Sequence, residues 1–421
     1  MTAPREQEFR RAPATLIAAI LLTLSITIAG CGGGKSEDTY PSAGAPLSPA
    51  LQQVLEDDAT LRDLPVPEGI RAAAIPRDQV REVIAGMLSD EDRAAFQQLT
   101  ALYRLMGIIG PNDDYEVLYL DFASRAVIGF YAPEDLLLRI IDEDQSLDFA
   151  SFSPILQSTV AHELIHAIQD RHFKLEDLLH RAASDPDWSL ALSAVIEGDA
   201  VHYERLWGAE HLAGQSGGLP GEGLTGAGIP AALERELRFP YESGIDWVNL
   251  KGSLDDNAAT NAILAGRRIS TAEILHPDRP TGSQRSTIDL PDVSGQLGSG
   301  WKREFRSSFG EFRLRNFLQL HLTGLPAVDG AAGWSGDQVA LYSDGEDSLA
   351  VLQVAFETPQ DADEFVTAMD SWLSAANAST TDDTSTLPGG RGLAIRRPAL
   401  NSVVLVFGSN PRITQRVAAI P

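Results

Sequence analysis

One pentapeptide, residues 162–166, constrains what this chain can fold into more than any other feature. It carries His162, Glu163 and His166 within a largely apolar stretch, which predicts a buried helix over about 153–172. Residues four apart on a helix project from one face, so the two histidines can bind one metal ion, with the glutamate on the adjacent face. Such side chains are costly to bury unless they are satisfied. The pattern therefore predicts a metal site, with a hydrogen-bonded polar core as the alternative.

A catalytic zinc ion needs three protein ligands and an open position for water, so the chain must supply a third ligand. Glu197 is one candidate, because in a predicted helix over 187–211 it shares a stripe with three apolar residues and faces inward. His172 is the other candidate, at the position where metzincin peptidases place their third histidine. However, Gln169 stands where that class has a glycine that breaks the helix, which favours Glu197.

Two segments, residues 159–170 and 195–200, resemble the gluzincin (thermolysin-type) zinc peptidases, and more closely a family of bacterial metallopeptidases, many of them exported. Weaker matches, which extend the resemblance over about residues 75–375, are 129–131, 240–244, 275–277 and 333–337. The resemblance implies a zincin-like fold and a peptide or protein substrate. It also implies a Zn²⁺ cofactor held by His162, His166 and Glu197.

Catalysis in such a peptidase needs a general base and a donor that stabilises the oxyanion formed from the attacked carbonyl. The resemblance implies that Glu163 takes a proton from the attacking water and passes it to the leaving amine. His276, which Pro277 follows, is the candidate for the oxyanion donor, or else an exposed turn histidine. Tyr241 and Tyr131 are weaker candidates for the same role.

Carboxylates commonly hold the outer ring nitrogen of a metal-binding histidine. Asp170 lies four residues after His166 and is predicted to hold that imidazole. Asp199 is predicted to do the same for His162, and a plain surface charge is the alternative for both aspartates. The predicted strand 127–131, just before the metal helix, is expected to present its edge to an extended peptide.

The N-terminus has the pattern of a bacterial lipoprotein signal. Three early arginines precede an uncharged apolar stretch, residues 14–30, which is followed by Cys31, the only cysteine of the chain. We therefore predict a signal peptide over 1–30, lipidation of Cys31 and a flexible tether over 31–50. The protein would then be a membrane-anchored lipoprotein outside the cytoplasm, with an uncleaved membrane anchor as the alternative.

Composition narrows the possible partners. The formal net charge of −26 would repel phosphate and excludes nucleic acid as a partner.

The function predicted is an exported, lipid-anchored, zinc-dependent peptidase that meets the membrane through its lipidated cysteine. One alternative is a catalytically silent metal-binding lipoprotein that uses a protease-like fold to bind a partner. Another is a metal-dependent hydrolase of a non-peptide bond.

The expected fold is α+β, with a mainly helical, zincin-like domain over 51–290 and a small α+β domain over 291–421. A Gly- and Pro-rich stretch, 277–300, marks the boundary. A β-hairpin of residues 127–131 and 136–141 precedes the metal helix. Other helices are predicted at 77–88, 90–106, 113–125, 187–211, 229–238, 242–251, 255–266, 308–322, 327–333 and 359–374. Other strands are predicted at 339–342, 349–354, 392–397 and 402–407.

Overall fold

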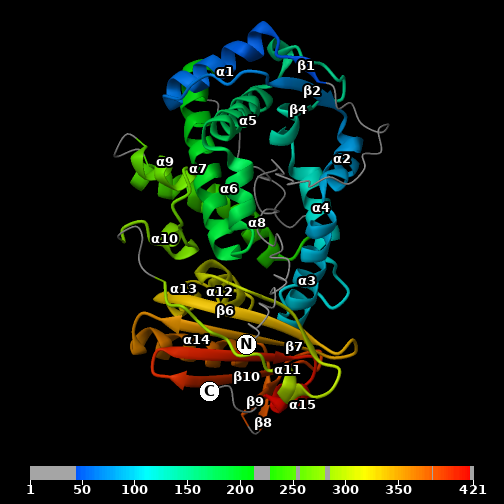
Figure 1. The fold of residues 1–421 in the computed structure, drawn as a ribbon, viewed down its shortest axis with the longest axis vertical. Helices are drawn as coiled ribbons and strands as arrows, with labels where there is room; N and C mark the ends of the chain where they lie inside the picture. Colours follow the sequence, from blue (N-terminus) through cyan, green and yellow to red (C-terminus); the bar gives the residue numbers. More distant parts are fainter. Residues whose placement is uncertain (1–43, 213–227, 253–256, 280–284, 382, 418–421) are drawn as a thin grey trace, which may run out of the picture.

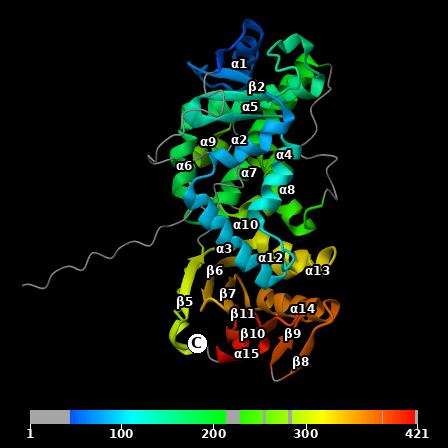
Figure 2. The same ribbon diagram turned by 90° about the vertical axis from the view of Figure 1, so that its right-hand side faces the viewer.

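The structure, a computed structural model, describes residues 44–212, 228–252, 257–279, 285–381 and 383–417. The fold is α+β, as predicted: helices and a small sheet form one part, and a larger sheet lies at the other end (Figures 1 and 2). Within the described ranges, no helix combines the length and the apolar character needed to cross a membrane. The predicted signal peptide, 1–30, and the predicted lipidation site, Cys31, lie outside the described residues.

Regular structure begins earlier than the sequence predicts. Three elements open the described chain: β1 (Ala45–Pro46), α1 (Pro49–Arg62) and β2 (Arg71–Ile75). Ser48 caps α1 through its side chain, and Pro49 occupies the first helical position. The predicted tether over 31–50 is therefore too long at its C-terminal end, because its Ser-Pro pair begins a helix.

A four-stranded sheet lies beside the metal helix, α5 (Pro154–Phe173), in the order β1-β2-β4-β3. The predicted hairpin is confirmed as β3 (Gly129–Ala132) paired with β4 (Leu137–Ile141), and β3 is an edge strand that packs on α5. Because β2 and β4 run parallel, a crossover must join them. The connection contains three helices, α2 (Val80–Met87), α3 (Asp90–Met106) and α4 (Tyr115–Ala126), followed by β3 itself.

Two further long helices, α7 (Pro186–His211) and α8 (Ala231–Trp247), pack against each other beside α5. The sequence predicts two helices in place of α8, at 229–238 and 242–251, because Pro240 removes one N–H donor. The structure instead has one helix that continues through Pro240, which lies on its buried face. Shorter helices pack around α7: α6 (Leu175–Ala182), α9 (Ala258–Leu264) and α10 (Thr271–Leu275).

The C-terminal part is built on a seven-stranded antiparallel sheet in the order β5-β6-β7-β11-β10-β9-β8. Its strands are β5 (Lys302–Ser307), β6 (Trp334–Ser343), β7 (Ser348–Phe356), β8 (Ser379–Thr381), β9 (Thr384–Thr386), β10 (Gly392–Ala399) and β11 (Ser402–Gly408). Its helices are α11 (Ser294–Leu297), α12 (Glu311–Leu318), α13 (Leu325–Ala331), α14 (Pro359–Ala375) and α15 (Pro411–Arg416). The central strands alternate between two buried clusters, so both faces of the sheet are covered.

A buried polar contact joins the two parts of the molecule. Glu236 of α8 accepts from the Tyr103 hydroxyl of α3 at 2.7 Å and from the Arg313 Nε of α12 at 2.6 Å. All three side chains are buried. Because a buried ion pair tolerates little displacement, this contact fixes α8 and α12 relative to each other.

Candidate metal centre

The predicted metal pentapeptide lies in the middle of α5, where the helix is buried on all sides. Ser153 caps the helix, and Pro154 begins it. His162 and Glu163 are each 5% exposed, and His166 is 2% exposed. The predicted helix is therefore confirmed, together with the burial that makes its polar residues informative.

α7 crosses α5 and brings Glu197, which is fully buried, to the two histidines. The Nε2 atoms of His162 and His166 lie 3.1 Å apart. The Oε2 atom of Glu197 lies 3.1 Å from Nε2 of His162 and 3.5 Å from Nε2 of His166. Among the described residues, this is the group of histidine and acidic side chains whose ligand atoms converge closely enough to hold a metal ion.

The geometry of this group fits a tetrahedral metal ion. Ligand atoms bound to zinc at about 2.0–2.2 Å lie about 3.3–3.6 Å apart when the geometry is tetrahedral, close to the three separations given above. The Oε1 atom of Glu197 is buried and has no hydrogen-bond partner among the described residues. Two nitrogens and one carboxylate are also a donor set that zinc accepts, so His162, His166 and Glu197 fit the ion.

The electrostatic environment of this group also favours a bound cation. Burial alone would lower the pKa of His162, but hydrogen bonds to Glu197 and Glu204 outweigh it and raise that pKa well above its usual value. Burial would raise the pKa of Glu197, but the charge of His166 and the hydrogen bonds of both histidines lower it. The two carboxylates around His162 therefore favour a positive charge at this place, and a metal cation would compete for it.

His172, the alternative third ligand, lies away from the group. It is exposed in the last turn of α5, where its ring contacts that of Phe173 edge-on. It follows His162 by ten residues, or about 15 Å along the helix axis. The structure brings Glu197 to the two histidines and does not bring His172 there.

The outer nitrogen of His162 is held by Glu204, and not by Asp199 as predicted. The Nδ1 atom lies 3.1 Å from Oε2 of Glu204, whose other oxygen accepts from the Ser158 hydroxyl at 2.6 Å. With a metal at Nε2, Nδ1 would carry the ring proton and donate it to Glu204. Glu204 follows Glu197 by two helical turns, and this seven-residue spacing was the signal that the sequence analysis missed.

The outer nitrogen of His166 is held by Gln169, and not by Asp170 as predicted. Its Nδ1 atom lies 2.9 Å from the Gln169 side-chain oxygen. The Gln169 amide nitrogen donates to Asp199 at 2.8 Å, and the same Asp199 oxygen accepts from Arg62 Nε at 2.9 Å. Since the amide nitrogen is engaged, the amide oxygen must face His166, which places the ring proton on Nδ1 and leaves Nε2 for a metal.

α1 supplies two buried polar side chains behind the centre, and the sequence analysis did not predict that helix. Arg62 is 1% exposed and also donates to Asn261 of α9 at 2.6 Å. Asp58, one turn earlier, is fully buried, and neither of its carboxylate oxygens has a hydrogen-bond partner among the described residues. Burial first, and then the charges of Asp57 and Glu204, raise the pKa of Asp58 well above its usual value.

Glu163 is oriented by the edge strand. Its Oε2 atom accepts from the backbone N–H of Tyr131 in β3 at 3.0 Å. Burial raises the pKa of Glu163, although the charges of both histidines oppose this. The hydroxyl of Tyr131 donates to Asp170 at 3.1 Å, so it is engaged at the flank of α5.

α8 brings Tyr241 to the other side of the histidines. Its ring lies roughly parallel to that of His162, with centroids 6.4 Å apart. This approach depends on two glycines, because a Cβ atom on Gly198 would lie 2.3 Å from the backbone of Gly244. A Cβ atom on Gly244 would in turn lie 2.0 Å from the carbonyl oxygen of Ala194, so α7 and α8 meet backbone to backbone.

His276, the predicted oxyanion donor, does not lie in this group. It ends α10, and its Nε2 atom lies 2.6 Å from Oε1 of Glu311 in α12. Glu311 is close enough to Asp187 for their charges to interact, and Asp187 lies in the first turn of α7. Because Glu197 follows Asp187 by ten residues, or about 15 Å along the axis, His276 belongs to the contact between α10 and α12.

Fold and site together define an α+β protein whose helical part encloses a candidate metal centre. Comparison with known families gives one match: a sequence model described as a domain of unknown function, DUF8575, matches residues 300–418. That range covers the seven-stranded sheet and leaves the metal centre outside. No curated protein matches the chain. No solved structure matches it either.

Proposed function

We propose that the protein is a zinc-dependent peptidase. One observation carries the proposal: two imidazole Nε2 atoms and the Oε2 atom of Glu197 converge within 3.5 Å of one another inside the protein. The Nδ1 atoms of both imidazoles are held by Glu204 and Gln169, so their lone pairs are directed at one point. Zinc bound there would act as a Lewis acid on a substrate carbonyl and would lower the pKa of water.

Glu163 is the general base in this proposal. Its carboxylate follows the first histidine on α5 and does not share in the convergence of ligand atoms, so it remains available to accept a proton. The N–H of Tyr131 fixes its orientation, and burial raises the pKa of Glu163, which favours its accepting a proton. Glu163 would then take a proton from the attacking water and deliver it to the leaving amine.

The edge strand β3 is the proposed place for an extended substrate. It is the last strand in the order β1-β2-β4-β3, pairs on one side only, and packs directly on α5. An extended peptide added to this edge would lie next to Glu163, whose carboxylate is already bonded to the strand. In Gly129→Pro the strand loses one N–H donor, and we expect turnover of a peptide substrate to fall; unchanged turnover contradicts substrate addition at this edge.

The predicted export and lipidation remain part of the proposal. In the mature protein Cys31 would carry lipid and place the helical part beside a membrane, outside the cytoplasm. Growth with labelled palmitate should label the wild-type chain and leave Cys31→Ser unlabelled. A labelled Cys31→Ser variant contradicts the proposed anchor.

The peptidase proposal is tested by measuring the zinc content of the purified chain together with its hydrolysis of a mixed peptide library. We expect one bound zinc in the wild type and in Glu163→Gln, with turnover about 10²–10⁴-fold lower in the variant. Glu176→Gln, on the neighbouring helix α6, is the matched control and should keep both properties. Full zinc content without hydrolysis in the wild type contradicts the proposal and supports a silent metal-binding lipoprotein.

A further inference from the structure

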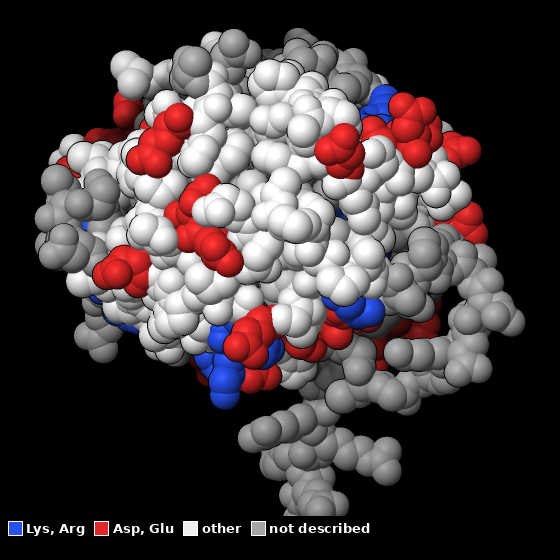
Figure 3. Space-filling view, turned by 90° about the horizontal axis from the view of Figure 1, so that it is seen from above, with Lys and Arg blue, Asp and Glu red and all other residues white. Residues whose placement is uncertain are grey.

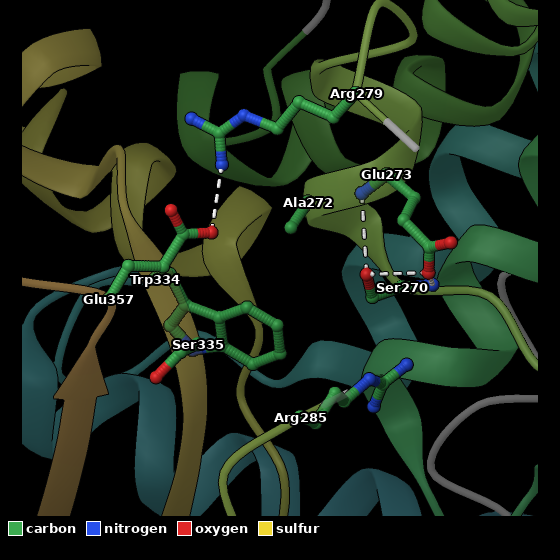
Figure 4. A pocket seen from close by; sticks show the side chains of 8 residues that line it. All are labelled: Ser270, Ala272, Glu273, Arg279, Arg285, Trp334, Ser335 and Glu357. Carbon is green, nitrogen blue, oxygen red and sulfur yellow. Dashed lines mark hydrogen bonds and ion pairs between the residues drawn. The ribbon is translucent and has the colours of Figure 1, made fainter. Parts of the chain in front are cut away.

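A polar crevice lies where the helical part meets the seven-stranded sheet. It is lined by the start of α7, the end of β5, the start of β6 and the segment 285–288, and has a volume of about 420 Å³. A smaller pocket of about 60 Å³ shares Arg285 and Trp334 with it (Figure 4). Gly336 allows the walls to approach, because a Cβ atom there would lie 2.4 Å from the carbonyl oxygen of Ser286.

The crevice gathers arginine side chains in an acidic protein. Its lining includes Arg268, Arg285 and Arg306, although the whole chain has 33 basic against 59 acidic residues. The face seen from the α1 end carries mostly acidic side chains among its charged residues (Figure 3). Three guanidinium groups around one cavity are therefore a local exception, and not a sample of the general surface.

Two of the three arginines are held rigidly. Arg285 pairs with the buried Asp187 at 3.1 Å, and its guanidinium lies 5.7 Å from the centre of the Trp334 ring. Arg268 lies over the ring of Trp188 at 4.3 Å and also pairs with an aspartate. Each guanidinium has five N–H donors in a fixed fork, so these contacts fix the position of the group without using all of its donors.

The carboxylates that line the crevice already have partners. Asp185 accepts from the Ser308 hydroxyl at 2.6 Å and pairs with two of the arginines. Asp337 accepts three N–H groups, each at 2.7 Å. The ion pair of Arg306 with Asp289 is long, 3.7 Å, and Asp289 is 98% exposed, so it holds Arg306 only weakly. The guanidinium of Arg306 is therefore available to a ligand.

We propose that this crevice binds a small molecule that carries a carboxylate or phosphate group. Arg306 and Arg268 would bind its oxygens directly, since a guanidinium fork matches either group. Arg285 would form the fixed wall of the site, and the hydroxyls of Ser286 and Thr287 line the same cavity. Unlike the side chains of the candidate metal centre, these side chains offer hydrogen-bond donors to the oxygens of a bound anion.

The site is separate from the candidate metal centre and does not depend on the proposed function. Asp185 caps α7, and Glu197 follows it by twelve residues, or about 18 Å along the helix axis. A small molecule cannot reach both places. Its binding should therefore be the same in the metal-loaded and the metal-free protein.

The test is calorimetric titration of the purified full chain with inorganic phosphate and, separately, with succinate. At least one anion should bind the wild type, and Arg268→Gln/Arg306→Gln should weaken its Kd at least tenfold, or about 1.4 kcal/mol. Arg306→Gln alone serves as a second variant, because its side chain is 40% exposed and its loss should leave folding intact. Arg81→Gln, an exposed arginine paired with Asp121, is the charge-matched control and should bind as the wild type does.

The choice of anion identifies the ligand group. Phosphate binding alone indicates a phosphorylated ligand, and succinate binding alone indicates a carboxylate. Thermal unfolding in the presence of each anion is a second measurement. Because such anions also stabilise proteins without binding a site, a rise in the melting temperature supports the proposal only if the double variant does not show it. The proposal is overturned if neither anion binds, or if the double variant binds as tightly as the wild type.

Discussion

Glu197 in the helical part and Asp337 in the C-terminal part are both buried carboxylates, but their surroundings differ. Asp337 accepts from the backbone N–H groups of Phe309 and Gly310 and from the indole of Trp334. Glu197 faces imidazole nitrogens, and its other oxygen has no partner among the described residues. Protein N–H donors satisfy both oxygens of the first carboxylate, whereas one oxygen of the second has no protein partner among the described residues. A buried carboxylate alone therefore does not indicate a metal site. A buried carboxylate with an unpaired oxygen, next to other possible ligand atoms, does indicate one.

The largest effect should follow from removing the unsatisfied carboxylate. In Glu197→Ala we expect zinc affinity to fall about 10²–10³-fold, because one of three protein ligands is lost from a site worth about 10–16 kcal/mol. Competition with a chelator of known affinity measures the change. His172→Ala is the control and should bind zinc as the wild type does. Equal losses in both variants would contradict the assignment of Glu197 as the third ligand.

The next largest effect concerns how α7 is held beside α8. Gly198→Ala places a Cβ atom 2.3 Å from the backbone of Gly244, so one helix must move. We expect the free energy of unfolding to fall by about 3 kcal/mol, as in overpacked cores. Urea unfolding measures this, and Gly295→Ala, where a Cβ atom would meet nothing within 4 Å, is the control. An unchanged midpoint in Gly198→Ala would show that the two helices can separate at little cost.

Substitution of Asp337, the satisfied carboxylate, should lower the stability of the fold and leave zinc binding unchanged. Asp337→Asn turns an amide N–H₂ group towards one of three N–H donors, and a buried unsatisfied donor costs about 1–3 kcal/mol. We expect urea unfolding to report a loss in that range, with zinc affinity unchanged. A loss of zinc binding in the folded variant would contradict the separation between the two carboxylates.

The smallest effect should come from the residue that supports the metal centre indirectly. Arg62→Lys keeps the charge beside Asp199 but cannot contact both Asp199 and Asn261 as the planar guanidinium does. We expect zinc affinity to fall about tenfold, the lower end for residues that orient metal ligands. The absorption spectrum of the cobalt-substituted protein should also shift, because the imidazole of His166 is oriented less firmly. Arg81→Lys, on the surface, should change neither property.

The parts of the site predicted from sequence are those fixed by local periodicity. The spacing of His162 and His166 on one helix, and the inward stripe of Glu197 on another, follow from 3.6 residues per turn. Gln169 and Arg62 could not be found in this way, because their roles depend on contacts between α1, α5 and α7 that no single helix encodes. Asp170 was predicted in place of Gln169 because a carboxylate is the commoner partner of a metal-binding histidine.

The elements of the fold also divide into those that local sequence predicts and those that depend on distant contacts. The helices α3, α5, α7 and α14 all have side-chain caps, and all four agree with the prediction. α3 and α14 each have one apolar face, whereas α5 and α7 are long, largely apolar and buried on most sides. The edge strands β5 and β8 were not predicted, because they are largely exposed and lack an apolar alternation. Their pairing partners in the sheet decide their conformation, and one segment of sequence does not contain that information.

The parallel pairing of β2 with β4 has a mechanical consequence. The connection between the two strands leaves the small sheet, extends to the large sheet and returns, and at the far turn α3 contacts β7 and β11 (Figure 1). Arg391, which precedes β10, donates to the carbonyl of Leu105 at that turn at 2.9 Å. The large sheet thus supports the helices α2, α3 and α4, which connect β2 to β3, and β3 contacts Glu163. Loosening the large sheet should weaken the support of the small sheet and of Glu163, so heat should melt both parts in one cooperative step.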